Sequence, residues 1–434
     1  MKLAKFYPLF LLFALFAVAC SSDNSSDSNE PLVSQDPVDT PGQIELSIGG
    51  FSGFGDTPFS LVILRENGTE AQRFDGITQL PQNISLDDGN YQVVLESLRP
   101  EVITVNTNLF GGASSMFTVV KNQVENIVIS VAKEPFKGWV LVPDVPVAAR
   151  RGASSFLLNG NIYVGFGFDE DNMLLKDWWR YSIATNEWTQ LPDFPDLRRA
   201  FMTSFSIDSV GYITLGIVED EVFLDLRTTE LWSFDAQTEQ WNQEEDFTSI
   251  WRSGPVAMVI GNNAYVGTGF DNGAVVTLSD FYELNGDNKL WSNSSDFTGP
   301  PTYGFGTFTL GDQGHLLAGT VNGDVRTNQH YVFDSQSQIW EPLSDLPGDA
   351  RLEAVCFTVN DIGYYGLGSI TNNQPGTDFW RYNTEQDSWT EVSSFPGESR
   401  FSPVWGSNNE VGYCGFGRGR FGVFNDLYLY YPED

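Results

Sequence analysis

Tryptophan recurs at an almost constant interval through most of this 434-residue chain. The successive spacings are 49, 53, 50, 49 and 49 residues between Trp139, Trp188, Trp241, Trp291, Trp340 and Trp389. A repeat of about fifty residues forms one small sheet that cannot bury both of its faces alone, so neighbouring repeats must pack against each other. The interval therefore predicts an all-β domain of six four-stranded sheets stacked around a common axis.

Other residues keep the register of the tryptophans. Arginine lies eleven residues after five of them, whereas the fourth repeat has Tyr303, twelve residues after its tryptophan. A Gly-x-Gly turn follows, as in residues 165–167, with degenerate versions expected at 214–216 and 318–320. An aromatic strand then follows, as in residues 177–181. The five arginines are Arg150, Arg199, Arg252, Arg351 and Arg400.

This pattern resembles the kelch repeat, in which Arg opens the unit, Tyr precedes a Gly doublet, and Tyr and Trp follow about six residues apart. Gly-x-Gly in place of Gly-Gly is similar to kelch lipoproteins of Bacteroidota. The resemblance covers residues 138–434 and implies a six-bladed kelch β-propeller. Because the last repeat ends after its aromatic strand, we expect the strand around Trp139 to complete the last blade, which gives a domain of residues 136–434.

The N-terminus carries an export signal. Lys2 and Lys5 precede a short apolar run that ends in Ala17-Val18-Ala19-Cys20, as in a secretory signal with a small-residue cleavage site. The segment resembles a bacterial lipoprotein signal, which implies that residues 1–19 are removed and that a lipid on Cys20 anchors the chain to a membrane. An ordinary signal peptide that happens to end in Cys is the alternative.

Residues 20–42 are rich in Ser, Asp and Pro, a composition that favours a flexible tether because it cannot bury apolar area. A Ser/Asp-rich stretch after the lipidated Cys is similar to the tethers of Bacteroidota surface lipoproteins. The expected location is therefore the outer membrane of a Gram-negative bacterium, exposed on the cell surface.

Short alternating apolar runs between residues 43 and 134 predict a small β-sandwich. Residues 84–94 resemble a strand of transthyretin-like (carboxypeptidase regulatory-like) domains. The expected role is a spacer, with carbohydrate binding as the alternative.

The balance of charges limits the possible partners. There are 57 acidic and 23 basic side chains, which give a formal net charge of −34. Such a surface has no bulk electrostatic attraction for a polyanion, so nucleic acid is excluded as a partner. We expect a monomer.

A propeller binds ligands at the mouth of its central channel, and the arginines are expected where the innermost strands begin. Five guanidinium groups there would attract a carboxylate-bearing ligand. The alternative is that each arginine pairs with an Asp of the column that precedes it. Tyr303 and Glu353, as irregularities in the repeat, are the first candidates for ligand contact.

No metal or cofactor site is expected. Galactose oxidase, a copper enzyme with a kelch propeller, needs two His, two Tyr and a Cys, whereas this chain has only His315 and His330. The register places His315 with Ile162 and His330 with Trp178, both scaffold positions.

Cys356 and Cys414 are expected to be buried free thiols, because neither has metal-ligand spacing. The acidic clusters at 169–171 and 219–221 lack the spacing of a calcium-binding loop and are expected to be solvated, with Ca²⁺ binding as the alternative.

These features predict a surface-anchored binding protein whose propeller mouth recognises a glycan or a protein, and binding is expected rather than catalysis. One alternative is a sialic acid mutarotase-like enzyme, because six-bladed kelch proteins include sialic acid mutarotases; the arginines would then hold the substrate carboxylate and Glu353 would transfer a proton. A structural scaffold in an envelope complex is the other alternative.

Overall fold

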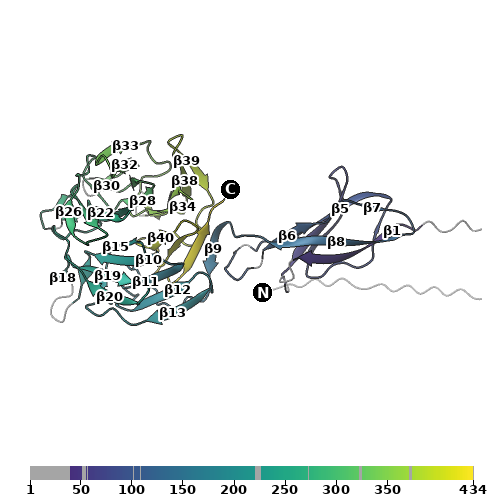
Figure 1. Ribbon diagram of the computed structural model, residues 1–434, viewed down its shortest axis with the longest axis horizontal. Helices are drawn as coiled ribbons and strands as arrows, with labels where there is room; N and C mark the ends of the chain where they lie inside the picture. The colour runs from purple at the N-terminus through teal and green to yellow at the C-terminus, as the bar shows by residue number, and fades with distance from the viewer. Residues whose placement is uncertain are drawn as a thin grey trace, which may run out of the picture.

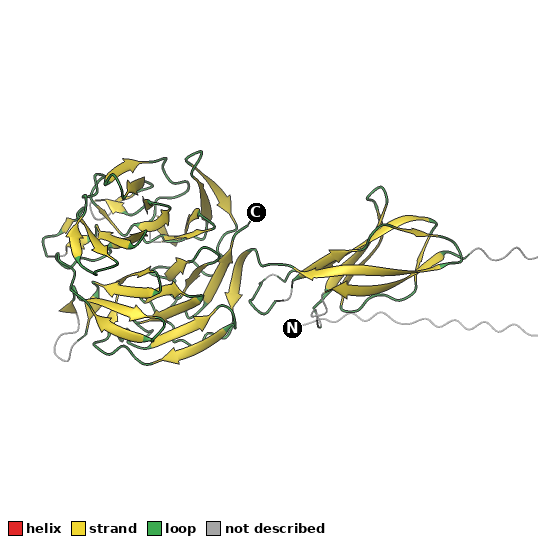
Figure 2. Cartoon of the chain, viewed as in Figure 1, coloured by secondary structure: helices red, strands yellow, loops and turns green. Residues whose placement is uncertain are grey.

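The computed structural model describes residues 40–50, 55, 57–100, 102–107, 109–219, 226–271, 273–321, 325–370 and 374–433. The expected signal segment, Cys20 and nearly all of the expected tether lie outside these residues. The regular elements that are described are all β-strands (Figure 2). In this part of the chain, no helix is long and apolar enough to cross a membrane.

The larger part of the chain is a propeller-like ring of six four-stranded antiparallel sheets (Figure 1). Each sheet begins with an inner strand, and each inner strand contacts the next, with the sixth returning to the first. We number the sheets from one to six in the order of these inner strands. They are β10 (Ser154–Leu158), β15 (Thr203–Ile207), β21 (Val256–Ile260), β28 (Gly306–Leu310), β34 (Val355–Val359) and β40 (Val404–Ser407).

The remaining strands run outward in chain order. The second strands are β11 (Asn161–Gly165), β16 (Val210–Thr214), β22 (Asn263–Gly267), β29 (Gln313–Leu317), β35 (Ile362–Gly366) and β41 (Gly412–Gly415). The third strands are β12 (Trp178–Ser182), β19 (Leu231–Asp235), β25 (Phe281–Asn285), β32 (His330–Asp334), β38 (Phe379–Asn383) and β42 (Leu427–Tyr431). The outer strands are β13 (Glu187–Leu191), β20 (Gln240–Gln243), β26 (Trp291–Asn293), β33 (Ile339–Pro342), β39 (Ser388–Val392) and β9 (Gly138–Val142).

The sixth sheet takes its outer strand from the start of the ring. β9 pairs with β42, so that Trp139 lies opposite Tyr430. Without β9, the backbone groups along that edge of β42 would lack partners.

The periodic tryptophans occupy one position in all six outer strands, opposite an apolar residue of the third strand. The pairs are Tyr181–Trp188, Phe234–Trp241, Leu284–Trp291, Phe333–Trp340, Tyr382–Trp389 and Tyr430–Trp139. The rings also reach across sheets: Trp139 lies 5.1 Å from Phe379 and 5.0 Å from Phe395, between ring centroids. The nearly constant interval between tryptophans thus reflects one repeated position at which a sheet packs against the next.

A glycine turn follows the second strand of each sheet. Its last residue has φ between 80° and 101° and is glycine in all six sheets, at Gly167, Gly216, Gly269, Gly319, Gly368 and Gly417. A side chain is strained in this left-handed region, and a Cβ on Gly167 would lie 2.7 Å from the carbonyl oxygen of Arg151. In the fourth sheet the turn is residues 317–319, so the expected register of 318–320 was wrong by one residue.

A second, shorter set of strands surrounds one end of the ring, and we call it the rim. The residues just before an inner strand pair with residues after the glycine turn, which pair in turn with a third segment. The rim strands are β14 (Arg199–Ala200), β17 (Ile217–Val218), β18 (Leu226–Arg227), β23 (Phe270–Asp271), β24 (Val276–Thr277), β27 (Thr302–Tyr303), β30 (Thr320–Val321), β31 (Val325–Arg326), β36 (Ser369–Ile370) and β37 (Gln374–Pro375). Isolated bridges continue it in the first and sixth sheets, including Arg151–Phe168 and Phe401–Arg418.

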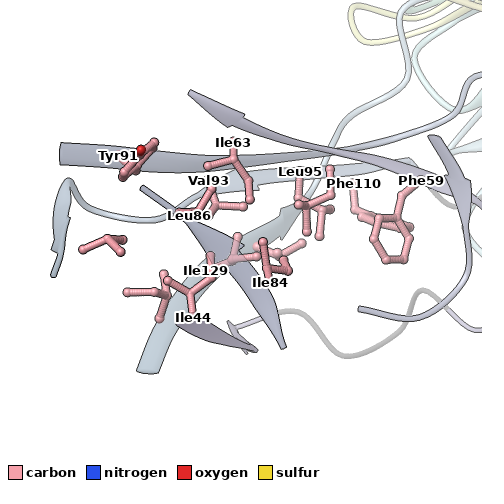
Figure 3. Packing of buried hydrophobic residues seen from close by; sticks show 14 residues of the cluster. Ile44, Phe59, Ile63, Ile84, Leu86, Tyr91, Val93, Leu95, Phe110 and Ile129 are labelled. Carbon is pink, nitrogen blue, oxygen red and sulfur yellow. The ribbon is translucent and has the colours of Figure 1, made fainter. Parts of the chain in front are cut away.

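The N-terminal domain is one hydrogen-bonded sheet, in the order β3-β2-β5-β6-β8-β1-β4 with β7 paired to β5. Alternate residues of its strands enter a single core, which includes Ile44, Ile63, Val93 and Ile129 (Figure 3). One path of paired strands therefore surrounds the core in the segment for which the sequence predicted a small β-sandwich. The strands are β1 (Gly42–Gly50), β2 (Phe59–Arg65), β3 (Glu70–Ile77), β4 (Ile84–Leu86), β5 (Gly89–Ser97), β6 (Phe110–Ala113), β7 (Phe117–Val119) and β8 (Val124–Lys133).

A loop of this domain covers the free edge of β9. The amide of Val105 donates to the carbonyl of Leu141 at 3.0 Å, and the amide of Leu141 donates to the carbonyl of Ile103 at 2.8 Å. The edge that closes the ring is thus itself paired.

We expect Trp139→Ala to destabilise the ring by about 3–5 kcal/mol, because it removes a 7% exposed indole and leaves a cavity. Urea unfolding measures the change. Ile339→Ala is the matched control on another outer strand, and since Ile339 is 53% exposed it should cost about 0.5 kcal/mol or less. Equal costs for the two variants would contradict the closure by β9.

Candidate functional site

The five arginines that the sequence placed at the mouth are buried inside the sheets. Arg150, Arg199, Arg252, Arg351 and Arg400 are each 0–1% exposed. Each binds a carboxylate just before the third strand of its own sheet, and the partners are Asp177, Glu230, Asp280, Asp378 and Asp426. The expected ring of ligand-binding guanidinium groups was therefore wrong. The alternative was that each arginine pairs with an Asp of the column that precedes it, and this named the wrong partners. The acidic residues that pair with the arginines lie just before the aromatic third strand.

Arg351 shows what these residues do. Its Nη1 and Nη2 donate to the two carboxylate oxygens of Asp378 at 3.0 and 2.6 Å. Nη1 also donates to the carbonyl of Leu367 in the glycine turn, and Nε donates to the carbonyl of Asp349. Burial raises the pKa of Asp378, but the hydrogen bonds and charge of Arg351 outweigh it and hold the pKa below its usual value. Arg150, Arg252 and Arg400 repeat the bond to the turn, so four of the arginines tie three segments of one sheet together. Arg199 instead bonds to Glu230 and to Asp196.

The fourth sheet lacks this ion pair. Thr302 pairs with Val321 as Arg199 pairs with Val218, so Thr302 occupies the arginine position and Tyr303 the position after it. Gln329 stands where the other sheets have an acidic residue before the third strand. The fourth sheet thus has neutral residues in place of both charges. Tyr303 was expected in the arginine column, but it lies one residue after that column.

A cavity of about 420 Å³ opens at the rim end of the ring, where the inner strands begin. All six sheets contribute to its wall. Tyr303 and Glu353 line it, and Glu353 is the one carboxylate among its lining residues. Aromatic rings make up much of the wall, from Phe201, Trp251, Tyr303, Phe305 and Trp405. Hydroxyl groups come from Ser155, Thr203, Ser204, Ser253, Thr307 and Ser402. We call this cavity the mouth.

Six residues in the left-handed conformation encircle the mouth, two positions after each arginine or its Thr302 equivalent. Their φ values lie between 46° and 68°, at Gly152, Phe201, Gly254, Gly304, Glu353 and Ser402. Backbone bonds join neighbours, as from Phe201 to Gly152 at 2.8 Å and from Glu353 to Gly304 at 3.0 Å. Phe201, Glu353 and Ser402 thus hold a backbone conformation in which glycine is the least strained residue. Backbone strain of this kind is concentrated at functional sites.

Two of these three residues contact each other. The Oε2 atom of Glu353 accepts hydrogen bonds from the amide and hydroxyl of Ser402, at 3.2 and 3.0 Å. Phe201 is 42% exposed, and its ring lies beneath the guanidinium of Arg151 at 5.6 Å. The mouth thus offers one oriented acceptor and an exposed aromatic face.

Trp405 lines the mouth and is an exception among the inner strands. The same position of the other inner strands holds only small residues, namely Ser155, Ser204, Ala257, Thr307 and Cys356. Trp405 also lines a second cavity of about 250 Å³ that continues along the inner strands. Ser155, Ser204, Ala257 and Thr307 line both cavities as well. Sequence reasoning did not select Trp405, although a Trp among small residues was a visible signal.

His315 and His330 form a buried pair in the fourth sheet. The Nδ1 atom of His315 lies 2.8 Å from the Nε2 atom of His330, and burial lowers their pKa values to about 3 and about 4. His315 lies opposite Phe308 as Tyr163 lies opposite Phe156, so it replaces the tyrosine of the second strand. Its expected alignment with Ile162 was wrong by one residue.

No group of three or more metal-ligating side chains occurs in the described ranges. Cys356 and Cys414 are buried free thiols, and burial raises the pKa of each; for Cys414 it reaches about 12. Asp169 of the first acidic cluster caps its own loop, accepting from the amides of Asp171 and Met173. Of the second cluster, 220 and 221 lie outside the described residues.

We expect the ion pair of Arg351 to be structural. Arg351→Thr should cost about 3 kcal/mol of unfolding free energy, because Asp378 is left half-buried without a counter-ion. Adding Asp378→Gln reproduces the fourth sheet and should recover about 1 kcal/mol or more. A double-mutant cycle in urea measures the coupling, and strictly additive effects would contradict the assignment.

The histidine pair predicts acid sensitivity. Both pKa values are depressed in the folded state, so the unfolded chain binds more protons, and stability should fall as pH drops from about 6.5 toward 4. The loss by pH 4.5 should be about 5 kcal/mol for the two histidines together. His315→Tyr with His330→Leu, residues taken from equivalent positions, should reduce that slope, as measured by unfolding at several pH values. An unchanged slope would refute this explanation.

Comparison with known proteins identifies a fold. No family model and no curated protein matches the chain. Among solved structures, that of YjhT is similar, with 18% sequence identity and a TM-score of 0.56 over 66% of this chain and 96% of that one. At this identity the likeness supports the fold alone: an all-β, propeller-like chain.

Proposed function

We propose that the chain is a six-bladed kelch propeller that binds a glycan in its mouth. The observation that carries the proposal is the cavity itself, which combines aromatic faces with hydroxyl groups and one carboxylate, Glu353. Aromatic faces pack on the apolar faces of sugar rings, and hydroxyl and carboxylate oxygens bond to sugar hydroxyls. A mostly apolar cavity with few oriented polar groups is also the usual form of a binding site.

The anchor belongs to the same proposal. A lipid on Cys20 and a tether of residues 20–42 would hold the propeller at the outer membrane, on the cell surface of a Gram-negative bacterium. The domain of residues 43–134 would act as a spacer. Metabolic labelling with a radioactive fatty acid, lost in Cys20→Ser, tests the anchor independently of the ligand.

Of the residues that the mutarotase alternative requires, Glu353 lies at the mouth and the arginines do not. Glu353 lines the mouth, where it is available for proton transfer. The arginines assigned to a substrate carboxylate are instead committed to internal ion pairs. Proton NMR of freshly dissolved α-sialic acid decides it, since unchanged anomerisation kinetics with added protein exclude mutarotase activity. A protein ligand or an envelope scaffold predicts partners that co-purify with the chain.

We expect Phe201→Gly to weaken glycan binding about tenfold, because it removes an exposed aromatic face. The same change should leave stability unchanged or slightly higher, since glycine already stands at Gly152, Gly254 and Gly304 and relieves the left-handed strain. Binding of purified full-length protein to a glycan array, with urea unfolding alongside, measures both.

Ile339→Ala serves as the binding control, because Ile339 lies on an outer strand away from the mouth. The proposal fails if the wild-type protein binds no glycan, or if Phe201→Gly binds as well as the wild type.

A further inference from the structure

Three of the six junctions between neighbouring sheets share one backbone contact at the rim. The amide of the last turn glycine donates to the carbonyl at the arginine position of the next sheet. This bond is 2.9 Å from Gly167 to Arg199, 3.0 Å from Gly319 to Arg351 and 2.8 Å from Gly417 to Arg150. The residues that follow the two bonded residues are therefore brought close together at each of these three junctions.

The junction between the sixth and first sheets differs from the others. At the other five junctions the two equivalent positions hold neutral residues, namely Phe168 and Ala200, Ile217 and Ser253, Phe270 and Tyr303, Thr320 and Leu352, and Ser369 and Phe401. At the sixth junction these positions are Arg418 and Arg151, which the bond from Gly417 to Arg150 brings close enough for their charges to interact. Two cations thus occupy a position that is neutral five times in the same fold.

These two guanidinium groups have no carboxylate partner among the ion pairs of the described residues. Arg151 is held in place by the ring of Phe168 at 4.7 Å and by the side-chain oxygen of Asn172 at 3.1 Å. Burial and the charge of Arg418 both lower the pKa of Arg151, so the two cations repel each other in the folded chain. In a chain with a net charge of −34, this pair is a local patch of positive charge that can attract an anion.

The junction borders the mouth. Gly152, which follows Arg151, lines the cavity, and so does Ser402, which follows the bridge partner of Arg418. The ring of Phe201, which also lines it, lies under the guanidinium of Arg151. An anion between the two arginines would therefore be close to a ligand in the mouth.

We propose that Arg151 and Arg418 form a subsite for an anionic substituent, a carboxylate or a sulfate, on the glycan bound in the mouth. This inference rests on the proposed function. The planar guanidinium group presents paired donors that match two oxygens of such a group, and binding neutralises the repulsion between the arginines. The partly exposed position makes the interaction sensitive to salt.

The test compares three sugars that differ in one group: glucuronate, glucose 6-sulfate and glucose. Saturation-transfer NMR with full-length protein gives an affinity for each. The wild type should prefer at least one anionic sugar over glucose by about tenfold, and Arg151→Gln and Arg418→Gln should each remove most of that preference. Arg73→Gln is the charge-matched control, because Arg73 pairs with Glu70 and Asp75 in the N-terminal domain.

Inorganic sulfate separates this inference from the proposed function. At constant ionic strength, sulfate should raise the melting temperature of the wild type relative to chloride, and by less in Arg418→Gln. Sulfate stabilisation with this dependence supports the subsite even if no sugar binds. Equal affinity for the three sugars together with no sulfate effect overturns it, whether or not glucose binds. A preference between glucuronate and glucose 6-sulfate identifies the anion.

Discussion

The ring depends on the pairing of its last edge. The ring of six sheets closes only if the sixth sheet packs against the first. For that contact, the sixth sheet needs all four of its strands. β9 provides the missing strand, with Trp139 opposite Tyr430. The loop around Thr104 then covers the outer edge of β9. Everything at the mouth follows from this closure, because only a closed ring brings six inner strands around one cavity.

In five of the six sheets a buried arginine extends that order to the rim, as Arg351 does in the fifth sheet. It joins the segment before the inner strand, the glycine turn and the start of the third strand through a single, fully bonded side chain. The residues immediately after it are thereby fixed, and these residues form the mouth. Charge in the arginine column therefore serves the fold, whereas ligand contact is left to positions one to five residues further on.

The sequence predicted the architecture well because the architecture is repeated. Six tryptophans, five arginines and six turn glycines each occupy one structural position. It failed where the register was off by one residue. Thr302, not Tyr303, occupies the arginine position, and His315 occupies the position of the second-strand tyrosine. It also assigned the arginines to solvent, because a column of charges at strand starts looks the same in sequence whether it faces inward or outward. Glu353 was placed in the mouth by its irregularity, and the same reasoning applied to Trp405, Phe201 and Arg418 would have found them.

Hydrogen exchange of the full-length protein, with and without a glycan that it binds, tests the central claim most directly. We predict that protection is confined to the segments that begin the inner strands, residues 152–155, 201–204, 253–257, 303–307, 353–354 and 402–405. Protection on the outer strands or in the N-terminal domain, with the mouth unchanged, would contradict the account.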